Sequence, residues 1–308
     1  MKSKYTYGPV PSRRLGFSLG VDIIPFKNCT FNCIYCQLGK TTNITLERKE
    51  YTPIADIIEE IKDVIDKNQQ IDYITFSGSG EPTLHLGLGK LINETKKLTT
   101  IPVAVLTNSS LINISEVRVN LTSANVVLPT LCAASDTFFN NINRGHPDLS
   151  INSIIQGLID FRESYTGNIW LEIMLVKGIN DQPQALEELR RVVNRISPDK
   201  IHLNTVVRPP SENTASPLSI EELKPIQLLF GEKCEIIADF KKEPAPVSFV
   251  KTQSQVINLI KRRPVTMQDI KSITGLSRHE IVKHIDSLIK NKKIRKIRHS
   301  DRDYYEIL

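Results

Sequence analysis

The chain has 308 residues, of which 40% are hydrophobic and 24% are charged, and its formal net charge is +6. This length exceeds that of a typical single domain, so we expect one large domain and one small one. The first residues, Met1–Tyr5, are polar rather than a secretory leader, and no apolar run is long enough to cross a bilayer, so we expect a cytoplasmic protein without a membrane partner.

Between about residue 18 and residue 240, predicted strands alternate with predicted helices. Near-continuous apolar runs predict buried parallel strands at Leu19–Ile24, Asp72–Ser77, Pro102–Thr107, Asn125–Leu131, Ile169–Val176, Lys200–Val206 and Cys234–Asp239. Helical spacing of apolar residues predicts helices at Ile54–Asn68, Gly87–Leu98, Ile151–Tyr165, Gln182–Ile196 and Ile220–Phe230. This alternation indicates an α/β fold, either a barrel or an open wound sheet.

A linker and a small second domain are predicted after this region. Glu243–Pro246 has neither helical nor strand character, so we expect a large domain over residues 1–243 and a small one over residues 244–308. Three short helices and a hairpin are predicted in the small domain: Ser254–Lys261, a helix from about Thr266 to Gly275, a helix that opens with the capping box Ser277–Glu280, and strands Ile294–Arg298 and Tyr304–Leu308. Three helices followed by a hairpin resemble a winged-helix domain.

The positive charge is concentrated in this last segment. The segment from Val250 onward contains 14 of the 40 Lys and Arg residues and 6 of the 34 Asp and Glu residues. The part before it contains the other 26 Lys and Arg and the other 28 Asp and Glu. A net charge of +8 favours RNA or DNA as a partner of residues 250–308, and a protein-docking module is the alternative. The candidate contacts are Arg278, His279, Lys283 and His284 on the third helix and Arg295, Lys296 and Arg298 on the hairpin.

Three of the five cysteines, Cys29, Cys33 and Cys36, fall within eight residues. The spacing C-x3-C-x2-C lets one loop ligate three irons of a [4Fe–4S] cluster, which leaves the fourth iron open to another ligand. The alternative is a structural zinc site, but zinc prefers four closed ligands and the next cysteine is only Cys132.

Two loops at predicted strand ends carry further candidate ligands. Ser79, Gly80 and Glu81 follow the strand Asp72–Ser77, where glycine permits close backbone approach and the glutamate supplies a carboxylate. Asn108 follows the next strand, where an Asx turn to its own backbone is the alternative.

Together these segments resemble the radical S-adenosylmethionine (SAM) superfamily, whose motif includes an aromatic residue at the position of Tyr35. Gly8–Gly16 and Asn204–Pro210 further resemble the Fe–S oxidoreductase branch related to the archaeal wyosine base synthase. That synthase has extra cysteines for a second cluster, whereas none precedes Cys29 here, so its reaction is not carried over.

The resemblance implies a partial (β/α)6-type radical-SAM barrel with a [4Fe–4S] cluster and SAM as cofactors. Ser79, Gly80 and Glu81 would receive the amino group of SAM, and Asn108 would contact its ribose. Tyr35 and Thr130 are expected beside the cofactors, because strand ends converge at one mouth of a barrel.

The implied activity is the reductive cleavage of SAM to a 5′-deoxyadenosyl radical that abstracts hydrogen from a substrate, with a flavodoxin- or ferredoxin-like electron donor. The basic segment favours RNA as the substrate; a peptide or protein side chain is the alternative, and a DNA-binding Fe–S redox sensor is a third possibility. Cys132, at a strand end, is a candidate catalytic thiol that could donate a hydrogen atom or form an adduct, and its alternative role is a small buried residue. Anionic groups could bind Arg13, Arg14, Arg144 or Arg208, of which Arg208 has the best position near a strand end.

Overall fold

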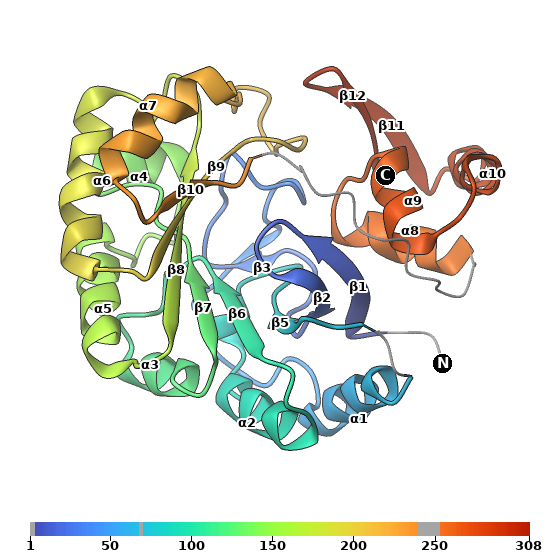
Figure 1. The fold of residues 1–308 in the computed structure, drawn as a ribbon, viewed down its shortest axis with the longest axis horizontal. Coiled ribbons are helices and arrows are strands. Elements are labelled where there is room, and N and C mark those ends of the chain that lie inside the picture. Colours follow the sequence, from blue (N-terminus) through green and yellow to red (C-terminus); the bar gives the residue numbers. More distant parts are fainter. Residues whose placement is uncertain (1–3, 68–69, 239–252) are drawn as a thin grey trace.

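The computed structural model describes residues 4–67, 70–238 and 253–308, and Figure 1 shows their arrangement. One eight-stranded sheet has the order β1-β2-β5-β6-β7-β8-β9-β10. Its strands are β1 (Thr6–Ser12), β2 (Gly16–Val21), β5 (Tyr73–Phe76), β6 (Val103–Thr107), β7 (Val126–Pro129), β8 (Asn168–Leu175), β9 (Lys200–Thr205) and β10 (Cys234–Ile236). From β2 to β10 every neighbouring pair is parallel, whereas β1 runs antiparallel to β2 at the edge.

Helices connect the parallel strands and lie on the outside of the curved sheet (Figure 1). They are α1 (Ile54–Ile65), α2 (Leu88–Leu98), α3 (Ser115–Leu121), α4 (Asp136–Ile142), α5 (Ile151–Ser164), α6 (Pro183–Ile196) and α7 (Ile220–Phe230), with a short 3-10 turn at Pro82–Leu84. In α6 the buried residues Leu186, Leu189, Val193 and Ile196 follow helical spacing, so one face packs on the sheet. Six strand–helix units followed by β10 confirm the predicted partial (β/α)6-type barrel.

The edge strand β1 was not predicted from the sequence. It contains Pro9 and Pro11, which argue against a central strand because proline lacks the N–H group that a ladder needs. An edge strand tolerates proline, and among the described strands β1 pairs with β2 alone.

Residues 253–308, here called the C-terminal region, contain three helices and a hairpin as predicted. They are α8 (Gln253–Arg262), α9 (Met267–Thr274), α10 (Arg278–Lys290), β11 (Ile294–His299) and β12 (Arg302–Ile307). The predicted capping box between Ser277 and Glu280 is present at the start of α10. The hairpin turn is tighter than expected, because Ser300 and Asp301 both adopt positive φ, as a two-residue type I′ turn requires.

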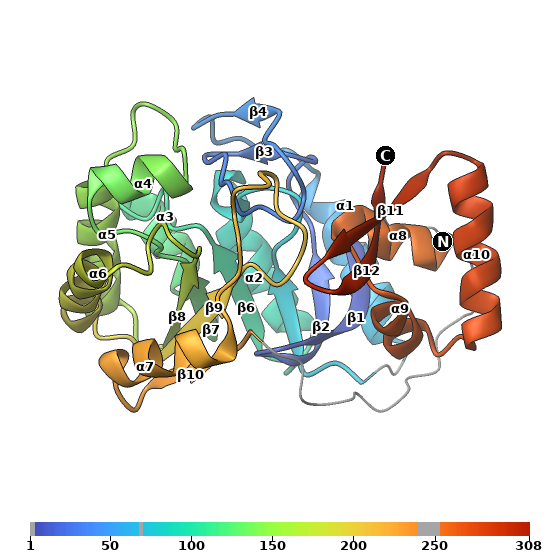
Figure 2. The same cartoon turned by 90° about the horizontal axis from the view of Figure 1, so that it is seen from above.

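The C-terminal region has an apolar core of its own and also packs on the barrel. Val10 of β1 contacts Leu259 of α8 and Ile273 of α9. Figure 2 shows the region beside β1 and β2. The predicted linker Glu243–Pro246 and the predicted boundary at residue 243 lie outside the described residues, so the division into two domains stays a prediction.

None of the helices in the described ranges combines the length and the apolar character that crossing a membrane requires.

Candidate functional site

The three motif cysteines lie on one loop at the carboxyl ends of the parallel strands. Cys29 ends the two-residue strand β3 (Asn28–Cys29), which pairs with β4 (Asn43–Ile44) and so closes the loop at its base. The loop is also attached to the end of α4, because the Ile34 N–H donates to the Ile142 carbonyl at 3.0 Å. All three are free cysteines, and each residue taken as a whole is half-buried.

Each cysteine sulfur accepts a hydrogen bond from a nitrogen of a different side chain. Asn108 Nδ2 lies 3.5 Å from Cys29 Sγ, Asn143 Nδ2 lies 3.5 Å from Cys33 Sγ, and Lys27 Nζ lies 3.3 Å from Cys36 Sγ. Such N–H donors stabilise the thiolate ligands of iron–sulfur clusters and tune their potentials. The residues present therefore fit a [4Fe–4S] cluster held by three thiolates.

Sequence reasoning missed Lys27 and Asn143. Lys27 is buried, although a lysine beside a loop motif looks like a solvated residue, and it adopts a left-handed φ of 62°. Asn143 precedes Arg144 at the end of α4, where no local pattern connects it with a cysteine more than a hundred residues earlier. Only the fold brings these donors to the sulfurs.

Burial raises the pKa of Cys29 to about 12, with a further contribution from the nearby Glu81 carboxylate. Burial likewise raises the pKa of Cys33 well above its ordinary value. A bound metal displaces the thiol protons, so cluster binding would release protons from these groups. Within residues 4–67, 70–238 and 253–308, no three His, Cys, Asp or Glu side chains are arranged to hold a single metal ion.

Glu81 joins the loops that follow β5 and β6. Its Oε1 accepts hydrogen bonds from the Thr83 N–H at 3.1 Å, the Thr83 hydroxyl at 2.7 Å and the Thr107 hydroxyl at 2.6 Å, and its Oε2 accepts from the Asn108 N–H at 2.7 Å. The residue is 2% exposed, and burial raises its pKa against the effect of these donors. In this structure the carboxylate organises the mouth of the barrel, and its expected contact with the SAM amino group stays a prediction.

Gly80 brings the loop after β5 against the start of the cysteine loop. A Cβ atom built on Gly80 would lie 2.0 Å from the Asn28 carbonyl oxygen, so no other residue fits there. The Lys27 N–H donates to the Ser79 carbonyl at 2.8 Å and continues the same contact. The predicted close approach at this glycine is present, and its partner in the structure is the cysteine loop.

Ser79, which stands where the superfamily motif has glycine, is held by a buried carboxylate. Its hydroxyl donates to Asp22 Oδ2 at 2.6 Å, and its N–H donates to Asp22 Oδ1 at 3.1 Å. Arg262, at the end of α8, forms an ion pair with Asp22, and its Nη1 donates to the Ser79 hydroxyl at 3.0 Å. The C-terminal region therefore contacts the loop expected to receive SAM.

Asn108 combines the two roles considered for it. Its Oδ1 accepts a hydrogen bond from the Ser110 N–H at 3.0 Å, which is an Asx turn, while its Nδ2 faces Cys29 and donates to the Thr30 hydroxyl at 2.8 Å. Thr130 lies at the same mouth, because its N–H donates to the Thr107 carbonyl at 2.9 Å. The ribose contact of Asn108 and the cofactor contact of Thr130 stay predictions.

Cys132 lies beside the cysteine loop and is 2% exposed. Its sulfur is 3.1 Å from the Tyr35 hydroxyl, which turns the aromatic side chain of the motif toward this thiol. Burial raises the pKa of Cys132 to about 11, so the thiol form dominates at neutral pH. Its catalytic role stays a prediction.

Three of the four candidate arginines, Arg14, Arg144 and Arg208, have carboxylate partners, and that of Arg208 is Asp269 of α9 at 3.9 Å. Arg14 Nη1 lies 2.6 Å from Glu172 Oε2 inside the barrel, and Arg144 Nη1 lies 3.0 Å from Glu212 Oε1. Arg13 donates to Asn204 Oδ1 at 3.0 Å, and Arg208 lies near the C-terminal region. Of these four arginines, Arg208 has a buried nitrogen, Nη1, without a hydrogen-bond partner among the described residues.

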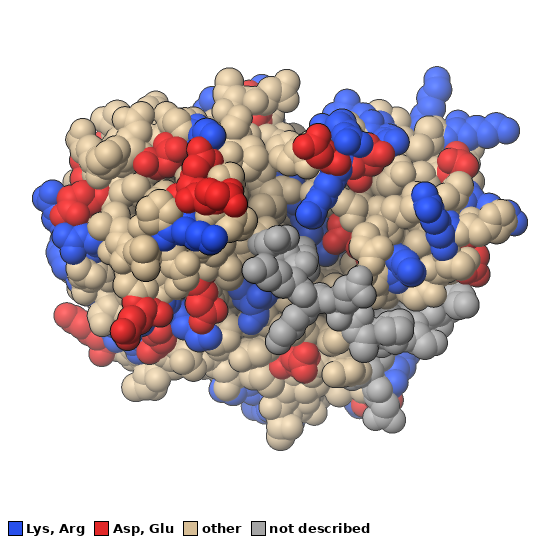
Figure 3. All heavy atoms as spheres, turned by 45° about the horizontal axis from the view of Figure 1, so that its top comes forward, with Lys and Arg blue, Asp and Glu red and all other residues tan. Residues whose placement is uncertain are grey.

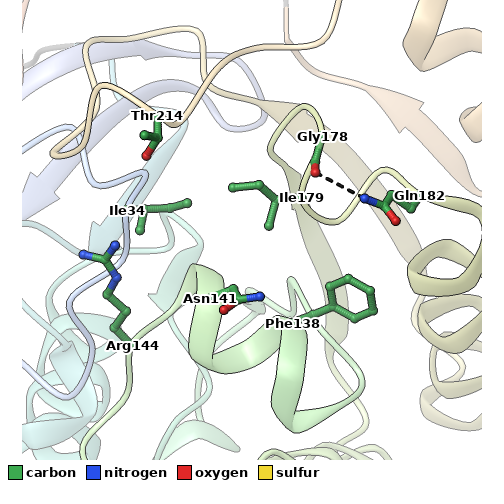
Figure 4. A pocket seen from close by; sticks show the side chains of 8 residues that line it. All are labelled: Ile34, Phe138, Asn141, Arg144, Gly178, Ile179, Gln182 and Thr214. Carbon is green, nitrogen blue, oxygen red and sulfur yellow. Dashed lines mark hydrogen bonds between the residues drawn. The ribbon is translucent and has the colours of Figure 1, made fainter.

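A pocket of about 350 Å³ lies next to the cysteine loop (Figure 4). Ile34 of that loop forms one wall, and Phe138 and Asn141 of α4 form another. The remaining lining residues are Arg144, Gly178, Ile179, Gln182 and Thr214. The lining contains both apolar and polar side chains, so a small molecule could bind there beside the cysteine loop.

Comparisons with known proteins agree with this geometry. The radical SAM superfamily profile matches residues 23–190. The UPF0026 protein MJ1312 of Methanocaldococcus jannaschii is 39% identical over 228 residues, which cover 73% of this chain and 71% of that protein. A protein of Brachyspira hyodysenteriae named GTPase Obg is 38% identical over 298 residues, so this chain, matched over 96% of its length, spans 44% of that relative.

The fold is also similar to a solved structure. The crystal structure of a radical SAM methyltransferase from Sphaerobacter thermophilus aligns with a TM-score of 0.50 at 16% identity and covers 71% of this chain and 65% of that one. At this identity the likeness concerns the fold alone. The identity to MJ1312 shows that the chain belongs to the UPF0026 proteins. The matched profile and the three cysteines with their surroundings show that it belongs to the radical SAM superfamily and is an enzyme whose cofactors are a [4Fe–4S] cluster and SAM.

Proposed function

We propose that this enzyme cleaves SAM reductively and modifies an RNA substrate that the C-terminal region helps to hold. The observation that supports the chemistry is the set of three cysteine sulfurs, each with its own N–H donor, beside the loop organised by Glu81. When bound, the cluster and SAM supply the electron transfer and the 5′-deoxyadenosyl radical. A flavodoxin- or ferredoxin-like protein is the expected electron donor.

The residues of the chain hold and orient these groups. Lys27, Asn108 and Asn143 donate hydrogen bonds to the sulfurs, and Gly80 allows the loop after β5 to approach them closely. Phe31 and Ile34 of the cysteine loop are buried, so this loop presents apolar side chains that keep water from the space behind it. Exclusion of water protects a reactive radical from side reactions.

The case for RNA comes from the exposed cations of the C-terminal region, which project from the right-hand part of Figure 3. On the hairpin, Arg295 pairs with Glu306, and Lys296 and Arg298 pair with Asp303. The cations of α10 and the turn after it have no ion pair within the described parts of the chain: Arg278, Lys283, Lys290, Lys292 and Lys293. This second set supports a phosphate-binding face on α10 rather than on the hairpin.

Two measurements on anaerobically reconstituted protein test the proposal. The first is the formation of 5′-deoxyadenosine from SAM in the presence of a one-electron reductant. The second is mass spectrometry of RNA from a deletion strain, from its parent and from the complemented deletion strain. A modified nucleoside is expected in the last two and not in the deletion strain. SAM cleavage without any RNA difference, together with a modified peptide, contradicts the RNA assignment.

A matched pair of variants tests the binding face. Replacing Lys290, Lys292 and Lys293 with alanine is expected to weaken RNA binding about tenfold and to flatten its salt dependence, because phosphate contacts release counterions. The control replaces Arg295, Lys296 and Arg298, whose charges are already paired, and a smaller loss is expected. A larger loss in the control would place the RNA on the hairpin and contradict the assigned face.

A further inference from the structure

The loop that follows β9 reaches the C-terminal region and carries Arg208. His299 of β11 donates through Nε2 to the Val206 carbonyl at 3.0 Å, and the Tyr304 hydroxyl of β12 donates to the Val207 carbonyl at 2.8 Å. Both carbonyls immediately precede Arg208, so the hairpin fixes the backbone from which this side chain starts. Arg208 therefore lies where the barrel meets the C-terminal region.

The Arg208 guanidinium is buried but incompletely paired. The residue is 8% exposed, and its Nη2 lies 3.9 Å from Asp269 Oδ1 of α9, which is longer than a hydrogen bond. Among the described residues, Arg208 Nη1 has no hydrogen-bond partner, and the same holds for the buried Nη2 of Arg263, which follows α8. A buried donor without a partner costs about 1–3 kcal/mol, so two of them at one place call for an explanation.

The charges near Arg208 are also unbalanced. Arg208 and Arg263 both interact electrostatically with Asp269 and repel each other. Asp269 Oδ2 is already engaged in the capping box of α9, where it accepts from the Thr266 N–H at 2.9 Å and the Thr266 hydroxyl at 3.0 Å. A single carboxylate, that of Asp269, thus interacts electrostatically with two guanidinium groups, and one positive charge remains in this group of three. Burial lowers the pKa of Arg208 to about 9, with Arg263 contributing next.

Polar residues lie between these arginines and the cysteine loop, some joined by hydrogen bonds and others interacting only electrostatically. Arg13 interacts electrostatically with Arg208 and donates to Asn204 Oδ1 at 3.0 Å. Asn204 Nδ2 donates to Glu172 Oε1 at 2.7 Å, and Glu172 interacts electrostatically with Tyr35. A ligand bound at the arginines would therefore adjoin the polar interior of the barrel.

We propose that Arg208 and Arg263 bind a phosphate group of the substrate between the barrel and the C-terminal region. Guanidinium forks pair with phosphate oxygens through two parallel hydrogen bonds. Two forks from separate chain segments suit a tetrahedral group with several acceptor oxygens, whereas one fork already satisfies a planar carboxylate. A phosphodiester also carries the single negative charge that balances the excess.

This inference deepens the proposed function and rests on it only for the identity of the substrate as RNA. The phosphate site itself requires only the two arginines and their surroundings. The two claims can therefore fail separately.

The test is a titration of the full-length protein with inorganic phosphate at constant ionic strength, followed by calorimetry and by thermal unfolding. Phosphate is expected to bind and to raise the unfolding temperature of the wild type. Arg208→Gln and Arg263→Gln are each expected to weaken binding by about tenfold or more, and Arg208→Lys, which keeps the charge but loses the fork, is expected to fall between. Arg295→Gln, which removes an exposed arginine paired with Glu306, is the matched control and is expected to bind as the wild type does.

Unchanged phosphate affinity in both Arg208→Gln and Arg263→Gln would overturn the site. If Arg208→Gln does not fold, the partly exposed Arg263 and the Arg208→Lys variant still decide the question. Acetate that stabilises the wild type as strongly as phosphate would overturn the phosphate assignment. Phosphate binding that depends on the arginines, combined with an absence of RNA modification, would retain the site and refute the RNA substrate.

Discussion

Glu81 and Arg208 are both buried and charged, yet their surroundings differ. Glu81 accepts four hydrogen bonds from residues of two loops, so both oxygens of its carboxylate have donors. Arg208 has a distant carboxylate and, among the described residues, a nitrogen without a partner. The mouth of the barrel is therefore organised by the protein alone, whereas the contact between the barrel and the C-terminal region has binding capacity left for a ligand.

The largest effect is expected from the cysteine loop, where the protein supplies ligands rather than hydrogen bonds alone. Cys33→Ala removes one of three sulfur ligands and is expected to lower both iron content and 5′-deoxyadenosine formation by more than about a hundredfold, because even residues that only support metal ligands contribute ten- to a hundredfold. Iron and sulfide analysis with chromatography of the nucleoside product checks this. Cys234→Ala, in β10, is the control and should keep its iron; normal product formation by Cys33→Ala would refute the cluster assignment.

Glu81→Gln tests the mouth of the barrel, where both carboxylate oxygens have hydrogen-bond donors. An amide cannot accept from all four donors, so the free energy of unfolding is expected to fall by about 3 kcal/mol, as measured by denaturant unfolding. The control is Glu47→Gln, because Glu47 is exposed and pairs with the exposed Lys49, and a loss below about 0.5 kcal/mol is expected there. Equal losses in the two variants would mean that the hydrogen bonds of Glu81 contribute nothing special.

His202 of β9 is a buried, uncharged group whose Nδ1 has no hydrogen-bond partner among the described residues. Burial, together with the positive charge of Arg14, lowers its pKa to about 4 from the ordinary value of 6.5. Between pH 6.5 and pH 4 the histidine is protonated in the unfolded chain but neutral in the folded protein. The contribution of His202 to the free energy of unfolding is therefore fully present above about pH 6.5 and is lost as the pH falls toward 4. His202→Phe is expected to reduce this loss by roughly 1–3 kcal/mol in unfolding experiments across this range. An unchanged pH profile in His202→Phe would refute the assignment.

The smallest effect on the free energy of unfolding is expected at Arg208, whose guanidinium group is incompletely paired. In phosphate-free buffer, Arg208→Gln should change the free energy of unfolding by less than about 1 kcal/mol, because the buried guanidinium has few interactions to lose. Arg14→Gln is the comparison, since it leaves Glu172 without its ion pair and should destabilise by about 3 kcal/mol or more in the same denaturant experiment. A loss for Arg208→Gln as large as that for Arg14→Gln would remove the contrast between the two regions.

Local patterns in the sequence predicted much of the fold and of the candidate site. Apolar runs predicted the parallel strands, and their alternation with helices predicted the barrel class. Cys29, Cys33 and Cys36 were found because a cluster loop needs ligands that are close in the chain. The comparisons confirm the superfamily.

The remaining features depend on contacts between distant segments. Lys27 and Asn143 reach the sulfurs only after folding, and the pairing of Arg14 with Glu172 joins the turn between β1 and β2 to β8. The edge strand β1 was missed because its two prolines weaken the strand pattern. The interaction between Arg208 and Arg263 could not be predicted, because no local sequence pattern around either residue indicates that the other is near.

The ion pair between Arg262 and Asp22 has a consequence for how this chain could be recombined. Asp22 lies in the barrel beside Ser79, and its cation comes from the end of α8. A chimera that joins this barrel to an unrelated C-terminal domain would lose Arg262 and leave the buried Asp22 carboxylate without that ion pair. The two parts must therefore have been adjusted to one another, and a transplant that succeeds would have to bring along a replacement for Arg262 as well.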